Sequence, residues 1–152
     1  MMRTRWDLEL AKYDTDVIAW SLQQAEFLRT AQFDKLDIEH LADEIEDVGK
    51  AEVREFERRM AELIASLIRW QYQPHLRGSQ WTLIINGCRM QVHGMLKETP
   101  SLAVELKKPR FCSHVWADGA RMAESVGGPY EKPYLTSPAE NKSQGVLIAV
   151  DV

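Results

Sequence analysis

A regular row of apolar side chains in the middle of the chain constrains its fold more than any other feature. Steps of three, four, three, four and three residues separate its members, which are Val53, Phe56, Met60, Leu63, Leu67 and Trp70. These steps place the row on one side of an α-helix that packs lengthwise against other helices. The row predicts a core helix over residues 53–72, with its last five members buried together and meeting Trp20 or Trp81.

A second apolar row precedes the first and is out of phase with it. Its members are Ile38, Leu41, Ile45 and Val48. The step from Val48 to Val53 is five residues, which a straight helix does not place on one face. Glycine weakens a helix interior, so we predict a break or kink at Gly49. Asp37 is the expected N-cap of this segment.

The remaining apolar spacing is also helical and predicts an all-α protein. One helix should begin with Asp14 as its N-cap and end near Ala31, and another should begin with Ser79 as its N-cap. A chain of 152 residues is most simply one domain. We predict a helical bundle of four or five helices over residues 1–128, followed by an irregular tail over residues 129–152 that contains several prolines.

The end of the tail is apolar and bears on assembly. The run from Val146 to Val150 contains no charged residue. Such a run is poorly suited to water, and closed two-fold dimers are the commonest assemblies. We therefore expect a homodimer, or contact with another protein, with the tail or one of the last helices at the interface.

The charge distribution argues against a general nucleic-acid binder. The net charge is −4, and residues 1–76 carry 16 acids and 10 bases, whereas residues 77–152 carry 7 acids and 9 bases. Nucleic-acid binding needs a basic face. A small basic patch around Lys107, Lys108 and Arg110 keeps a nucleic-acid partner open as an alternative.

The sequence shows neither a membrane span nor a disulfide framework. No run approaches the ~20 apolar residues of a transmembrane helix, and the first residues lack the apolar region of a signal peptide. Cys88 and Cys112 form no Cys-x-x-Cys pair, so two reduced thiols are expected. We predict a cytoplasmic location.

One acidic row is the best candidate for a metal site. Asp37, His40, Glu44 and Asp47 follow at steps of three, four and three residues and share one side of a helix. A carboxylate–imidazole row of this kind could bind a divalent metal with help from another helix. The alternative is a solvated flank with Asp37 as a helix cap, and we predict this second arrangement, with no bound cofactor.

Several separated motifs resemble one protein family. The first three are the Tyr13-Asp14 start with Trp20, the Phe33-Asp34 to Leu36-Asp37 step and the Ile45–Gly49 run; the others are Arg69–Pro74 with Trp81, and the weaker Pro100–Leu102 and Trp116–Arg121. As an ordered set over residues 10–125, they resemble the bacterial domain-of-unknown-function family numbered 29. The resemblance implies an all-α bundle from a bacterial cytoplasm, with no assigned activity.

This chain departs from the family pattern at two places. The segment Ser66-Leu67-Ile68-Arg69 stands where family members often have His-Leu-Leu-Lys, and the tail after Tyr134 differs from the usual ending. No nucleophile elbow, His-Glu-x-x-His motif or phosphate loop is present. The sequence favours a non-enzymatic interaction or regulatory module. The alternatives are a metal-binding bundle enzyme that uses His40 and Glu44, and a nucleic-acid partner that uses the basic second half.

Overall fold

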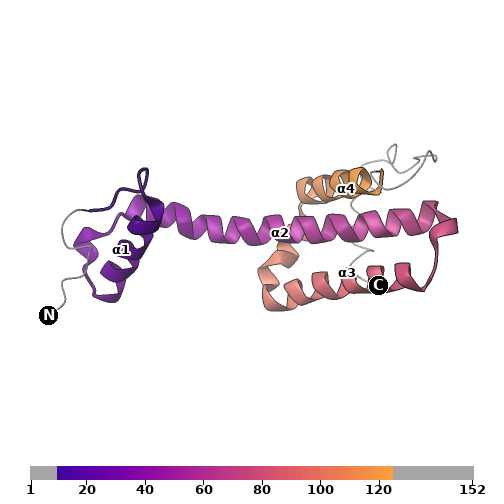
Figure 1. The fold of residues 1–152 in the computed structure, drawn as a ribbon, viewed down its shortest axis with the longest axis horizontal. Helices are drawn as coiled ribbons and strands as arrows, with labels where there is room; N and C mark the ends of the chain where they lie inside the picture. The colour runs from indigo at the N-terminus through magenta and orange to yellow at the C-terminus, as the bar shows by residue number, and fades with distance from the viewer. Residues whose placement is uncertain (1–9, 125–152) are drawn as a thin grey trace. The chain divides into compact units, whose positions relative to one another are not determined.

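A computed structural model describes residues 10–124, and this part of the chain contains four α-helices, three 3-10 helices and no strand. In chain order they are α1 (Val17–Arg29), η1 (Phe33–Lys35), α2 (Ile38–Tyr72), η2 (Pro74–Leu76), α3 (Ser79–Glu98), η3 (Pro100–Lys107) and α4 (Pro109–Glu124) (Figure 1). The all-α prediction is confirmed. The predicted tail over residues 129–152 lies outside the described residues.

The chain divides after Lys50 into two compact units. The first contains α1, η1 and the beginning of α2, and the second contains the rest of α2 and the helices that follow. The expectation of a single domain over residues 1–128 stays a prediction, and each unit is described by itself.

The second unit holds the hydrophobic core. Within this unit α3 and α4 lie on opposite sides of α2 (Figure 1). Phe56, Met60 and Leu63 are completely buried, and Leu67 and Trp70 are partly buried against the same core. Residues of α3, η3 and α4 complete it, among them Val92, Leu102, Phe111 and Val115. The predicted burial of the row is confirmed for Phe56, Met60 and Leu63, whereas Leu67 and Trp70 are only partly buried.

The expectation that this row meets Trp20 or Trp81 stays a prediction, and each tryptophan also has other neighbours. Trp81 lies near the guanidinium of Arg69, whose Cζ is 5.9 Å from the ring centroid. Trp20 is buried in the first unit, where it contacts Tyr13 and His40.

The helix continues through Gly49, so the predicted break there is wrong, whereas the alternative of a kink stays a prediction. α2 runs without interruption for 35 residues, and a side chain at Gly49 would meet nothing within 4 Å. One glycine costs a helix only about 1 kcal/mol, which the surrounding turns absorb. The step of five residues instead separates two apolar rows that lie in different units.

Two helix starts differ by one or two residues from those predicted. α1 is capped by Asp16, whose carboxylate accepts a 3.0 Å hydrogen bond from the amide of Ala19. Asp14 lies instead in the turn before the helix. The N-cap of α3 is Gly78, and Ser79 is the first helical residue. Local composition identifies the turn in both cases, but it places the cap only to within one or two residues.

The end of α1 is closed by a left-handed residue that is not glycine. Ala31 has a φ of 56°. Its amide donates to the carbonyl of Leu28, and the amide of Gln32 donates to the carbonyl of Phe27. These two bonds form a Schellman motif, in which glycine is the usual residue at this position.

Replacing Ala31 with glycine is expected to stabilise the protein. Glycine adopts the left-handed conformation without the steric cost that a Cβ atom imposes, which is about 1 kcal/mol. The free energy of unfolding from urea denaturation should rise by up to about that amount. Ala25→Gly, in the helical part of α1, should lower it, because glycine is unfavourable there. An equal loss from both changes would contradict the role assigned to Ala31.

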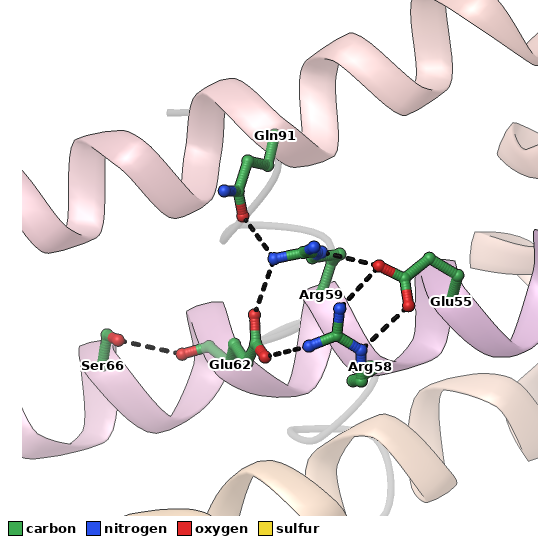
Figure 2. Close-up of polar contacts among 6 residues, drawn as sticks. All are labelled: Glu55, Arg58, Arg59, Glu62, Ser66 and Gln91. Atoms are coloured by element: carbon green, nitrogen blue, oxygen red, sulfur yellow. Dashed lines mark hydrogen bonds and ion pairs between the residues drawn. The ribbon is translucent and has the colours of Figure 1, made fainter.

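A network of ion pairs lies along the part of α2 that belongs to the second unit (Figure 2). Arg58 contacts Glu55 at 2.6 Å and Glu62 at 2.5 Å. Arg59 binds both glutamates and also reaches across to the side-chain oxygen of Gln91 on α3, at 3.0 Å. The hydrogen bond from Arg58 is the largest of the effects that hold the pKa of Glu55 down to about 2. These ion pairs join residues three and four positions apart on α2, and Arg59 also links α2 to α3.

Two sequence expectations concern membranes and thiols. Within residues 10–124, no helix combines the length and apolar character needed to cross a membrane.

Cys88 and Cys112 are free thiols, half-buried and buried respectively, as expected. Burial raises the pKa of the Cys88 thiol, which keeps it protonated.

Candidate functional site

Polar and aromatic side chains gather in the first unit at the beginning of α2. They form what we call the polar–aromatic cluster, which consists of Tyr13, Trp20, Gln24, Asp37, His40 and Glu44. Trp20 and Gln24 are one turn apart on α1 and are both buried. Asp37 precedes α2, and His40 and Glu44 follow on its first two turns.

Asp37 is at the centre of this cluster. One of its carboxylate oxygens, Oδ2, accepts from Trp20 Nε1 at 3.1 Å and contacts His40 Nδ1 at 2.7 Å. The other accepts from the backbone amide of His40 at 3.4 Å, so the predicted N-cap is confirmed. The backbone amide of Asp37 donates to Gln24 Oε1 at 2.8 Å. Both the amide and the carboxylate of Asp37 therefore join α1 to the beginning of α2.

Tyr13 closes the cluster from the segment before α1. Its ring stacks on His40 with centroids 4.2 Å apart and meets Trp20 edge to face at 4.9 Å. Its hydroxyl donates a 2.5 Å hydrogen bond to Glu44 Oε1. Aromatic contacts of both kinds are favourable. Tyr13 thus ties the chain entering α1 to the second turn of α2.

The contacts shift the pKa values of three members. Burial pushes the pKa of Asp37 upward, but hydrogen bonds from His40 and Trp20 outweigh it and hold that pKa below the ordinary 3.8. The hydrogen bond to Asp37 raises the pKa of His40 above its ordinary 6.5. The hydrogen bond to Glu44 raises the pKa of Tyr13, so its hydroxyl stays protonated at neutral pH.

The Asp37–His40 pair predicts a defined pH window for the stability of the first unit. The raised pKa of His40 means that its contribution is complete below 6.5 and is lost as pH rises through the folded-state pKa. The lowered pKa of Asp37 means that its contribution is present above 3.8 and is lost as pH falls through its folded-state value. The pair therefore contributes fully between these two ordinary values.

NMR titration of the histidines tests this expectation. The pKa of His40 should lie above 6.5, and Asp37→Asn should lower it, because asparagine keeps an oxygen for the helix cap but removes the charge. As a control, Asp47→Asn should leave it nearly unchanged, since Asp47 pairs with Lys50 at 2.8 Å. A His40 pKa that does not respond to Asp37→Asn would rule out the pairing.

A cleft of about 510 Å³ borders the cluster. It is lined by residues 10–14, Gln24, residues 34–37 and His40. When neutral His40 donates its Nδ1 proton to Asp37, its Nε2 atom is left as an acceptor, as in bases oriented by a carboxylate. None of the residues lining this cleft is serine, threonine or cysteine. The His40 imidazole is therefore oriented, but the lining of this cleft offers it no serine, threonine or cysteine side chain to activate as a nucleophile.

The four residues of the candidate metal row are all engaged in hydrogen bonds or ion pairs, two of them with each other. Asp37 and His40 bind each other, Glu44 binds Tyr13, and Asp47 pairs with Lys50. Across residues 10–124, no three histidine, cysteine, aspartate or glutamate side chains are grouped so that they could hold a metal ion. The arrangement observed around Asp37 is a capped and hydrogen-bonded helix start.

The sequence interpretation missed Tyr13, Trp20 and Gln24 as members of the cluster. Gln24 interrupts the apolar row of α1 between Trp20 and Phe27. A polar side chain on a buried face needs a hydrogen-bond partner, and Asp37 is that partner. The interruption was therefore a usable signal. No local signal connects Tyr13 with Glu44, which lies 31 residues later.

The fold and the cluster define an all-α protein whose first unit is held by polar and aromatic contacts. A family model described as "Domain of unknown function DUF29" matches residues 12–139. The chain belongs to this family. The match contains the whole polar–aromatic cluster and extends past residue 125, where the sequence resemblance was expected to end. No curated protein and no solved structure matches the chain.

Proposed function

We propose that this protein is a non-enzymatic interaction module that binds another protein chain through its first unit. The observation that carries the proposal is the exposed apolar row of α2. Ile38, Ile45 and Val48 are 64%, 71% and 68% exposed. Residues seven apart return to nearly the same side of a helix, and Val48 follows Ile45 by three. We call these three residues the open row.

A comparable apolar row on α2 is covered by other helices. In the second unit, Phe56, Met60 and Leu63 repeat the pattern and are completely buried. Fully covering a side chain of this size stabilises a protein by about 1.5–3 kcal/mol. The open row presents similar apolar surface without that cover, which is typical of a protein-binding site.

Two further features of the first unit support the proposal. Ile18 and Leu22, four residues apart on α1, are also exposed. The members of the polar–aromatic cluster are hydrogen-bonded to one another, so the cluster is suited to holding α1 and α2 in place. A small unit with little apolar burial gains stability from a partner.

Site-specific photo-crosslinking in the native cell tests the proposal. A photoreactive phenylalanine at Ile45 should give a discrete crosslinked product. The same residue at Asp43, which is exposed but about 160° away around the helix, should give little. A product of twice the chain mass would identify the homodimer expected from the sequence, and another mass would identify a different protein. Absence of a discrete product at Ile45, or equal products at both positions, would refute the proposal.

A further inference from the structure

We infer that the open row receives a basic amphipathic helix from a different protein. The inference rests on the proposed interaction function and specifies the chemistry of the partner. Its basis is the combination of exposed apolar side chains and concentrated negative charge on one helical segment. An amphipathic helix that lays its apolar face on such a surface is a common mode of recognition.

The spacing of the open row fits a helix as the occupant. Ile38, Ile45 and Val48 extend over three turns of α2. In the second unit, the equivalent row of α2 packs against helices, with Val92 of α3 and Phe111 of α4 in the same core. Helix ridges pack into the grooves between such side chains. A partner helix would cover the open row in the same way.

The negative charge around the open row favours a basic partner. Between residues 37 and 47 the chain has six acidic residues and no lysine or arginine. Two of the exposed acids, Glu39 and Glu46, each directly follow an isoleucine of the open row. Glu46 also pairs with Lys50 at 3.5 Å, and both of these side chains are exposed. They are seven residues apart and therefore form a parallel carboxylate row on the same helix. A lysine or arginine beside the apolar face of a partner helix would meet this row.

The same charge opposes pairing of two first units. Residues 10–50 contain ten acidic and four basic residues, which gives a formal charge of −6. Two copies joined through their open rows would bring like charges together, which disfavours association. For this reason we assign the open row to a basic partner rather than to a second copy bound in the same way.

Binding of two synthetic helical peptides tests the inference. Both carry leucines at three- and four-residue steps, and their polar positions are lysine and arginine in one and glutamate in the other. Isothermal titration calorimetry with the full chain should detect the basic peptide and not the acidic one. Added salt should weaken the binding, since exposed charge pairs are screened.

Protein variants locate the binding. Glu39→Lys/Glu46→Lys should raise the Kd by at least about tenfold, because like charges replace two attractive pairs. Glu98→Lys/Asp118→Lys, which makes the same change in net charge on α3 and α4, should change it less than about twofold. Ile45→Ser should also weaken binding, and circular dichroism would show that the variant remains helical.

The outcomes separate this inference from the proposed function. If Ile45 crosslinks in cells but neither peptide binds at about 100 µM, or the acidic peptide binds as well as the basic one, the basic-helix inference fails and the interaction proposal stands. Equal effects of the two charge-reversal variants would also overturn the inference, since binding would then follow net charge alone. A crosslinked product of twice the chain mass at Ile45 would assign the row to a second copy instead.

Discussion

Leu63→Ala is expected to lower the free energy of unfolding by about 2–5 kcal/mol, the usual range for truncation of a buried leucine. Leu63 is completely buried in the core of the second unit. The change removes apolar contacts and leaves a cavity that the neighbouring helices fill only in part. Urea denaturation followed by circular dichroism measures the loss.

A second leucine provides the matched control. Leu83 on α3 is 72% exposed, so Leu83→Ala should change the free energy of unfolding by less than about 0.5 kcal/mol. The contrast isolates burial, because both substitutions remove the same atoms. A loss below that amount at Leu63 would mean that the apolar row of residues 53–70 does not form the core.

Gly119→Ala is expected to destabilise the protein by about 1–3 kcal/mol. A Cβ atom at Gly119 would lie 2.7 Å from Cγ2 and 2.8 Å from Cβ of Ile64, and 3.0 Å from the carbonyl oxygen of Ala61. These distances are too short, and the obstacles are a branched side chain near its root and a backbone atom. The close approach of α4 to α2 at this point requires glycine.

The same substitution at an open glycine should have the opposite sign. A Cβ atom at Gly87 on α3 would meet nothing within 4 Å. Gly87→Ala should therefore stabilise the protein by about 0.5–1 kcal/mol, because alanine has the higher helix propensity. Thermal unfolding of both variants gives the comparison. If Gly119→Ala stabilised the protein as much as Gly87→Ala, the close packing of α4 on α2 would be refuted.

The sequence alone determined the helical class and the core of the second unit. From Phe56 to Trp70 the apolar residues are three or four positions apart, so each is about one helical turn from the next. Local spacing is therefore sufficient to identify this buried helix face. The same holds for Asp37, because an N-cap contacts amides only two or three residues away. Its bond to the amide of His40 was predictable for that reason.

Only the tertiary structure decided how the first unit is organised. Local spacing shows that the apolar row changes phase at Gly49. It does not show whether the helix ends there or continues with its apolar residues on another face. The bond between Tyr13 and Glu44 joins residues 31 positions apart, which no helical period connects. Periodicity likewise identifies the open row as one side of a helix, but whether that side is covered depends on what packs against it. For Ile38, Ile45 and Val48, the described residues of this chain leave that side exposed.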